Sequence, residues 1–403
     1  MKKSLIALAA LAAASAASAQ SSVTVYGVID TSYSINNGSV SDVSGLAWGN
    51  LSSSRLGFRG VEDLGGGLKA GFNLEAGINT SAGDGVDGPS VDNTSAAVGS
   101  GGLTFGRRAT VSLIGNFGEV RLGRDYTPTY HNEAQFAPLG RNGAGASIIT
   151  QVSVVGTTRS RTSNGIQYLL PKLGGLYGEA MFAFGEQPDN AGTPAGIAED
   201  NGNYFGARIG FKSGPFDIAL SGGQTTVSRN IPPSTAANAD NDRTVYNLGA
   251  TYDFKVIKLF GLYSVQNQEN TVGSLTGGLN LSGTTTSTGN DLEAKAFSVG
   301  FTAPVGPGEF KFGYSTLELE NGQGLGTKPS ADKFAFGYQY NLSKRTALYA
   351  TYARIKNKDA AAGAGPTAGL TAGASRQRGL SGAAQTGANS SSTAIDLGIR
   401  HSF

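Results

Sequence analysis

Residues 395–403 read Ile-Asp-Leu-Gly-Ile-Arg-His-Ser-Phe, and this alternation of apolar and polar side chains decides the fold class. Successive side chains of a β-strand point to opposite faces, so the segment predicts a strand with one apolar and one polar face. The same pattern opens the chain, where Val23, Val25 and Ile29 alternate with polar residues. Both ends of the sequence therefore predict half-apolar strands.

Similar segments of about ten residues recur along the chain and predict sixteen strands. Their ranges are 23–33, 50–60, 68–78, 104–114, 117–125, 159–170, 174–185, 203–213, 215–225, 243–253, 256–266, 293–303, 308–318, 332–341, 344–354 and 393–403. Short connections with turn residues, such as 62–67 and 171–174, alternate with long polar ones, such as 79–103, 226–242, 267–292 and 355–392. This alternation predicts turns at one end of a sheet and long loops at the other.

The composition excludes several classes of protein. Glycine supplies 61 of 403 residues, roughly twice its ordinary share, while charged residues make up only 15%. Because the chain has no cysteine, a disulfide scaffold, a Cys-ligated metal and a thiol nucleophile are all excluded. Only two histidines are present, His131 and His401, and their distance in sequence argues against a shared metal. We expect neither a metal nor another cofactor.

The first residues predict a cleaved signal peptide over 1–19. Lys2 and Lys3 precede an apolar run from Leu5 to Ala14, and Ala17-Ser18-Ala19 forms a small-residue cleavage site. Removal of Lys2 and Lys3 leaves 29 basic and 29 acidic residues. A formal charge of zero gives no support to nucleic-acid binding.

The remaining chain, 20–403, predicts a single transmembrane β-barrel. No apolar run of about 18 residues follows residue 20, so a membrane-spanning helix is not available. An even number of ten-residue strands, apolar outside and polar inside, with short periplasmic turns and long external loops, is the pattern of an outer-membrane barrel. The sequence therefore predicts an all-β fold: a transmembrane antiparallel 16-stranded β-barrel.

Five stretches also resemble the trimeric general porins of the neisserial and Burkholderiales type. They are Ser22–Asp30, Ser54–Gly65, Gly118–Arg124, Arg161–Tyr168 and Leu397–Phe403. The resemblance implies an outer-membrane homotrimer of a Gram-negative bacterium, in contact with lipid and lipopolysaccharide and inserted by the barrel assembly machinery. It also implies that Phe403 serves as the insertion signal, and that the third loop, residues 126–158, folds into the lumen.

In this family arginines line the wall of the pore constriction, and strand alternation selects candidates among the arginines of this chain. Outward Leu56 and Phe58 place their charged neighbours inward, and the same argument places Arg108 inward and Arg107 outward. The predicted basic wall comprises Arg55, Arg59, Arg108, Arg121, Arg124, Arg159 and Arg161.

Asp125 and Glu133 are the predicted acidic residues on the loop side of the constriction. A field between basic wall and acidic loop would favour anions. The alternative is that the arginines are solvated lumen residues without effect on selectivity.

The predicted function is passive diffusion of small hydrophilic solutes and ions with a weak to moderate anion preference. No nucleophile elbow or phosphate-binding loop is present in the sequence, so no catalytic residue is predicted. Two alternatives stay open: a porin selective for one anion or organic acid, and a barrel that mainly presents loops as an adhesin or phage receptor.

Overall fold

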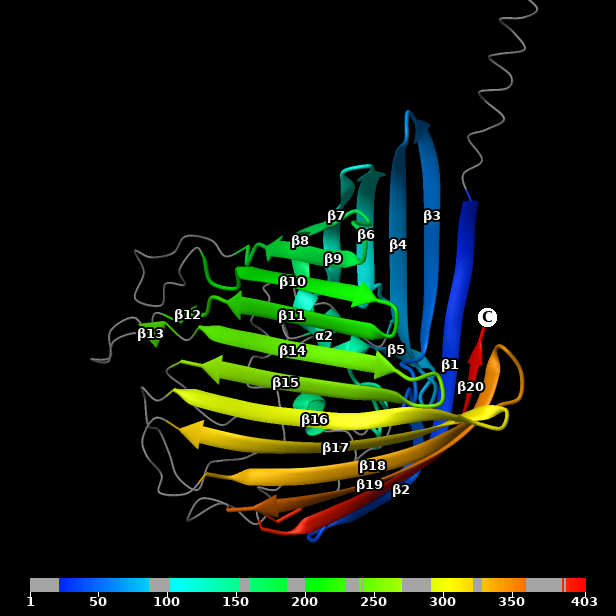
Figure 1. Ribbon diagram of the computed structural model, residues 1–403, viewed down its shortest axis with the longest axis vertical. Helices are drawn as coiled ribbons and strands as arrows, with labels where there is room; N and C mark the ends of the chain where they lie inside the picture. The colour runs from blue at the N-terminus through cyan, green and yellow to red at the C-terminus, as the bar shows by residue number, and fades with distance from the viewer. Residues whose placement is uncertain are drawn as a thin grey trace, which may run out of the picture.

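The computed structural model describes residues 22–86, 102–151, 160–186, 200–229, 239–240, 242–269, 291–321, 328–359, 386–387 and 389–403. The expected signal peptide, Arg159 and most of the long loops on which the adhesin alternative depends lie outside these residues. Over the described residues the chain forms a closed, antiparallel, 16-stranded β-barrel (Figure 1).

Sixteen long strands make up the wall of the barrel. They are β1 (Ser22–Asn37), β3 (Arg55–Gly65), β4 (Leu68–Asn79), β6 (Arg108–Gly115), β7 (Gly118–Tyr126), β8 (Arg161–Leu169), β9 (Leu176–Ala183), β10 (Tyr204–Ser213), β11 (Phe216–Thr225), β14 (Arg243–Asp253), β15 (Lys258–Gln268), β16 (Leu292–Val305), β17 (Gly308–Asn321), β18 (Ser330–Asn341), β19 (Thr346–Lys358) and β20 (Ser391–Ser402). Each pairs with its neighbours in chain order, and β20 pairs with β1.

The predicted alternation sets the two faces of this wall. In β14, for example, Tyr246 and Leu248 are exposed, while the intervening Val245 and Asn247 are buried. Exposed apolar side chains recur in the same way around the barrel, which is the surface that the hydrocarbon of a membrane requires. We call this the outer face, and the opposite one the inner face.

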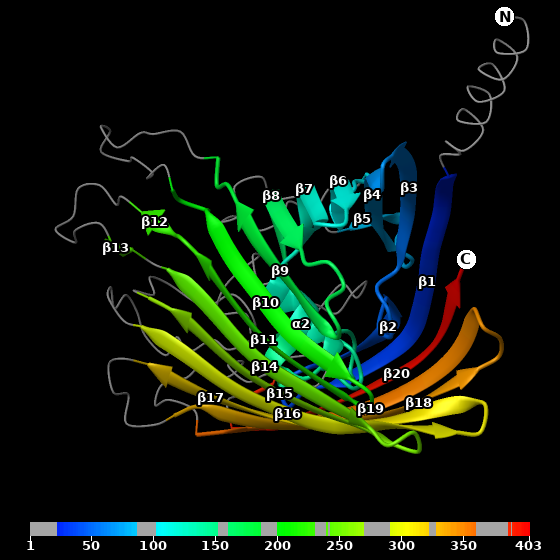
Figure 2. The ribbon, with the colours of Figure 1, turned by 45° about the horizontal axis from the view of Figure 1, so that its top comes forward.

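The barrel closes between the first and last strands, as the neighbouring blue and red strands show (Figures 1 and 2). Val28 pairs with Ser402, and the backbone N–H groups of Gly27 and Phe403 each donate to the other's carbonyl oxygen at 3.1 Å. A Cβ atom on Gly27 would lie 2.3 Å from the Phe403 ring and 2.8 Å from the Arg55 carbonyl oxygen. Glycine is therefore required where the chain ends meet. The role of Phe403 as an insertion signal stays a prediction.

Gly27→Val will lower the free energy of unfolding by about 1 to 3 kcal/mol, because the added methyl groups overpack the closure. The loss is measured as the fraction of refolded protein that stays assembled in detergent when the sample is not heated. Gly261→Val is the matched control, since Gly261 lies on the outer face of β15 with nothing within 4 Å of an added Cβ. Equal refolding of the two variants would contradict the closure argument.

Two short strands extend the sheet beyond the sixteen predicted, and two more form a separate pair. The first two are β2 (Asp42–Trp48), which pairs with β1, and β5 (Asp84–Val86), which pairs with β4; the separate pair is β12 (Ser228–Arg229) with β13 (Ala239–Asp240). The predicted strand at 50–60 starts later, at Arg55, because Asp30 holds the preceding residues. The Asp30 carboxylate accepts from the N–H groups of Leu51 and Ser52, and the Asp30 backbone N–H donates to the Ser54 hydroxyl oxygen.

The segment that follows β7 packs on the inner face of the barrel (Figure 2). It contains the helices α2 (Pro128–Gln135) and α3 (Ile148–Gln151). Thr127 caps α2 by accepting from the N–H of Tyr130 at 3.3 Å, and Pro128 fits the first turn because its missing N–H needs no partner there. The apolar side chains of the segment form the main buried cluster with alanine, leucine and isoleucine residues of β11 and β15–β20.

Candidate functional site

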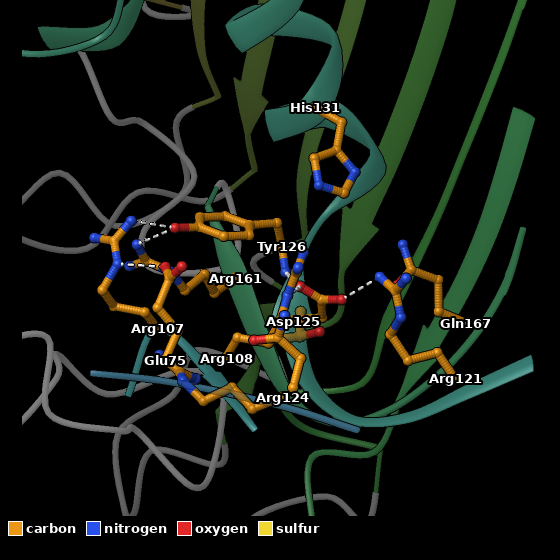
Figure 3. A network of polar contacts seen from close by, with 12 residues as sticks. Glu75, Arg107, Arg108, Arg121, Arg124, Asp125, Tyr126, His131, Arg161 and Gln167 are labelled. Carbon is orange, nitrogen blue, oxygen red and sulfur yellow. Dashed lines mark hydrogen bonds and ion pairs between the residues drawn. The ribbon is translucent and has the colours of Figure 1, made fainter. Parts of the chain in front are cut away.

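Arginines and carboxylates gather on the inner face where β3, β4, β6, β7 and β8 lie side by side (Figure 3). Glu75 in β4 is bonded by Arg107 at 2.7 Å and lies 3.6 Å from Arg55. The hydroxyl of Tyr26 also donates to Glu75, at 3.1 Å. One carboxylate therefore fixes two guanidinium groups that project from different strands.

Asp125, near the end of β7, organises a second pair of arginines. Its two carboxylate oxygens accept from Arg108 at 2.7 Å and from Arg121 at 2.6 Å, and Arg121 also contacts Glu119 at 2.9 Å. Only 1% of the Asp125 side chain is exposed. The prediction that Asp125 lies on the loop side of a constriction is wrong, because this carboxylate is built into the basic wall.

Tyr126 joins this cluster to α2. Its hydroxyl oxygen accepts from Arg107 at 2.5 Å and from Arg161 at 3.0 Å. Its ring stacks on Tyr130 with a centroid distance of 4.3 Å, and the guanidinium of Arg141 lies 4.1 Å from the Tyr130 centroid. Figure 3 shows Tyr126 between the arginines and the helix. The sequence reasoning did not single out this residue.

Arg59 is the exposed member of the cluster. Its guanidinium lies 5.1 Å from the centre of the Tyr26 ring. Together with Arg108 and Arg121 it lines an open cavity of about 230 Å³, to which Asn73 and Glu119 also contribute. The interaction of a cation with an aromatic face orients Arg59 without neutralising it.

Arg107 is the site residue that strand alternation misplaced. Alternation predicts that its side chain points outward, but the side chain is only 3% exposed and bonds Glu75. The reason is local: β6 begins at Arg108, so Arg107 precedes the regular strand, and its backbone N–H donates to the carbonyl oxygen of Glu75. Two successive arginines can therefore reach the same face.

Arg124 lies opposite a β-bulge in β8. Gly123 pairs with Gly165 and Asp125 pairs with Thr162, so Arg124 faces two residues, Ser163 and Asn164. Asn164 adopts a φ of 58°, which Asn tolerates better than most residues. Arg124 donates to the Ser163 hydroxyl and to the carbonyl oxygen of Gly106. Because Arg121 and Asp125 of β7 face inward, alternation turns Arg124 to the opposite face, so its predicted place in the basic wall is wrong.

The structure thus brings together an arginine wall, which we define as Arg55, Arg59, Arg107, Arg108, Arg121 and Arg161 with the carboxylates Glu75, Glu119 and Asp125. Six cations face three anions, so the wall carries a net formal charge of three positive. Each predicted arginine in this set contacts another member of the wall, Tyr26 or Tyr126.

Glu133, predicted to face the arginines, does not do so. It lies in α2 with its side chain fully buried, and it pairs with Arg141 of the same segment at 2.9 Å. His131 of the same helix bonds Glu179 of β9 at 2.8 Å. The charged side chains of α2 therefore pair with Arg141 and Glu179, which hold the helix in place, and not with the arginine wall.

Polar contacts attach α2 to the strands beyond β8. The amide of Asn132 donates to the carbonyl oxygens of Ala219 and Asn247, both at 3.3 Å. Its oxygen accepts from Arg208 at 2.9 Å. Gln135 adds a bond to Asp217 at 2.9 Å. These bonds satisfy buried polar groups on both sides of the contact, which stabilises the seat of the helix.

Apolar side chains that follow α2 fill spaces left by inner-face glycines. A Cβ on Gly249 would lie 2.1 Å from the Phe136 ring, and one on Gly313 would lie 2.9 Å from Leu139. Phe136 is completely buried. The glycines of β14 and β17 therefore form sockets for the segment.

The end of the segment is held by β20 and β17. Asp396 accepts from the N–H of Ala144 at 2.7 Å and from the hydroxyl of Ser34 at 2.6 Å. The N–H of Ile148 donates to the Ser315 hydroxyl at 3.1 Å. Residues 127–151 are thus fixed at several points from β9 to β20.

No metal site emerges from the side chains. Within the ranges that the structure describes, no three His, Cys, Asp or Glu residues are grouped so that they could hold a metal ion. His401 bonds the Thr346 hydroxyl at 2.9 Å. Among the same residues, none of the helices combines the length and hydrophobicity of a membrane span.

Comparisons with known proteins agree with the fold. Residues 5–360 match the family described as Gram-negative porin. The chain is 36% identical to outer membrane porin protein 32 of Delftia acidovorans, over the whole of both chains. It is 26% identical to major outer membrane protein P.IB of Neisseria meningitidis serogroup B, with 86% of this chain and 91% of that one covered.

Solved structures give the same result. An anion-selective porin from Comamonas acidovorans superimposes with a TM-score of 0.72 at 32% identity, covering 95% of this chain and all of that one. The trimer form of OmpT of Vibrio cholerae, at 14% identity and a TM-score of 0.63, shares the fold. This chain belongs to the Gram-negative porin family and is a channel protein of the outer membrane.

Proposed function

We propose that the arginine wall borders the narrowest part of the channel and gives this porin a preference for anions. The observation that carries the proposal is the excess of six guanidinium groups over three carboxylates on five adjoining strands. A surplus of fixed positive charge in a narrow aqueous gap raises the local concentration of anions and lowers that of cations. The name of the Comamonas porin supports the same direction.

The segment 127–151 forms the other border of the passage in this proposal. Its contacts with inner-face residues of β9 to β17 support a position inside the lumen, opposite the arginine wall. The segment then narrows the channel by its bulk, since Glu133 is paired with Arg141 and adds no free charge. Selectivity comes from the wall alone, and solutes pass without chemical change.

The proposed functional form is an assembly of several subunits in the outer membrane. The family resemblance implies a homotrimer that is surrounded by membrane lipid and lipopolysaccharide and inserted by the barrel assembly machinery. The exposed apolar outer face supports burial against lipid or other subunits. Each subunit would carry its own passage.

The reversal potential of the purified protein in a planar bilayer tests this function. Under a potassium chloride gradient we expect conductance steps in groups of three and a reversal potential of the sign that marks chloride as the more permeant ion. Cation selectivity would contradict the charge argument, and absence of conductance would contradict the channel. Flux of one organic anion that saturates at low concentration would favour the selective-porin alternative.

A further inference from the structure

Arg107 and Arg161 share one uncharged acceptor, although two guanidinium groups repel each other. Nη2 of Arg107 lies 2.5 Å and Nη2 of Arg161 lies 3.0 Å from the Tyr126 hydroxyl oxygen. Two nitrogens bonded to one oxygen are necessarily close together, so the like charges sit side by side. This arrangement requires an acceptor that forms hydrogen bonds with both guanidinium groups and so offsets their repulsion.

Elsewhere in the arginine wall, a carboxylate is the acceptor that holds two guanidinium groups together. Glu75 lies between Arg55 and Arg107, and Asp125 lies between Arg108 and Arg121. Each carboxylate cancels one of the two positive charges that it holds. A phenol oxygen accepts hydrogen bonds in the same way but has no charge at neutral pH, so it leaves both positive charges in place.

The Tyr126 ring is held in position from several directions. Tyr130 stacks at 4.3 Å, and the Arg161 guanidinium lies 4.5 Å from the ring centroid. The backbone N–H of Tyr126 donates to Asp125 at 2.8 Å, and only 8% of Tyr126 is exposed. The hydroxyl therefore has a fixed position against both arginines.

We propose that Tyr126 is a specificity-determining residue of the channel: its neutral hydroxyl positions Arg107 and Arg161 together at the wall without reducing their charge. The inference rests on the proposed anion-preferring function and deepens it. Tyr126 acts through the two arginines and is a positioning residue, not a binding residue for the permeating ion.

Tyr126→Phe tests the hydroxyl while it retains the stacked ring. We expect the chloride-to-potassium permeability ratio to fall about threefold, because the released guanidinium groups separate and the local field weakens. Tyr130→Phe is the matched control: it removes a hydroxyl from the other ring of the same stack, and we expect the wild-type ratio. Both variants should refold as well as the wild type.

Tyr126→Glu provides a second and independent test. It keeps an acceptor for both arginines but introduces a negative charge, so the ratio should fall at least as far as in Arg161→Gln. A residue with a purely structural role would give the wild-type ratio in Tyr126→Phe. If Tyr126→Phe fails to fold, Tyr126→Gln, whose amide oxygen is an uncharged acceptor, is compared with Tyr126→Glu, and equal ratios in these two variants would overturn the inference.

A wild-type ratio in Tyr126→Phe or Tyr126→Glu, measured beside an anion-selective wild type, would overturn the inference and leave the proposed function intact. A wild type without anion selectivity would instead defeat the proposed function itself. The two failures are therefore distinguishable in one series of bilayer recordings.

Discussion

Replacement of Arg55, Arg107 and Arg161 by glutamine will lower the chloride-to-potassium permeability ratio about tenfold and move the reversal potential toward cation selectivity. A unit charge 5 Å from an ion contributes about 0.8 kcal/mol in water, and three such charges exceed the 1.4 kcal/mol that corresponds to a factor of ten. Salt reduces the effect, since the Debye length is about 10 Å at 0.1 M. The substitutions remove the whole net formal charge of the arginine wall.

Glutamine is the appropriate replacement because it can still donate to the buried Glu75 and to the Tyr126 hydroxyl. A variant that lost these bonds would leave Glu75 without its close partner, and breaking a buried pair in this way destabilises proteins strongly. Lys172→Gln, Lys255→Gln and Lys344→Gln together are the matched control. They remove the same total charge from exposed positions in the short turns. A control that shifted the potential as much as the wall variant would refute the assignment of selectivity to the wall.

Gly249→Leu will dislodge α2 from the wall and give a noisy channel with frequent closures and a broad distribution of conductances. The added side chain would occupy the space of Phe136, which lies 2.1 Å from the position of a Cβ on that glycine. The hydrogen bonds of Asn132 nearby would then lengthen or break. Single-channel recordings measure the result directly.

Phe136→Ala removes the ring that packs against Gly249, so it tests the same contact without a steric clash. Loss of a fully buried phenylalanine costs about 3 to 5 kcal/mol of packing, so the seat of α2 should loosen and the same noise should appear. Gly261→Leu, at an unobstructed glycine of the next strand, is the control for both variants. Conductance indistinguishable from wild type in Gly249→Leu and Phe136→Ala would show that docking of the segment does not govern the passage.

The fold was predictable because alternation along a strand is a local property. Ile395, Leu397 and Ile399 predict the outer face of β20 by their spacing alone, and the structure closes the barrel between the two end strands, at Gly27 and Phe403. The same rule placed Arg55, Arg59, Arg108 and Arg121 on the inner face. Alternation fails only at residues that lie outside the regular pairing of the strands.

Arg107 illustrates that failure, because it precedes the first regular residue of β6. Nothing in the sequence near Arg107 marks where the regular strand begins. Arg124 was misplaced for a different reason: with Leu122 outward and Asp125 inward, alternation in β7 already turns Arg124 away from the inner face.

The acidic residues show a different limit. Asp125 and Glu133 belong to the segment around the third loop, and their charge suggested an acidic border opposite the arginines. Asp125 bonds Arg108 of the neighbouring strand and Arg121 of its own strand, and Glu133 bonds Arg141 further along the loop. Which cation each carboxylate pairs with depends on the assembled barrel. The sockets at Gly249 and Gly313 were hidden for the same reason.

The residues that supply charge and the residues that seat the segment occupy different parts of the chain. The arginine wall is contained within residues 55–161, whereas most partners of the segment 127–151 lie between Glu179 and Asp396; Ser53, Tyr126 and Ser160 are the exceptions. Under the proposed function, mutations in one region alter the preferred ion, while most mutations in the other alter the width of the passage. Natural selection can then tune these two traits of the porin largely separately, without repairing one each time the other changes.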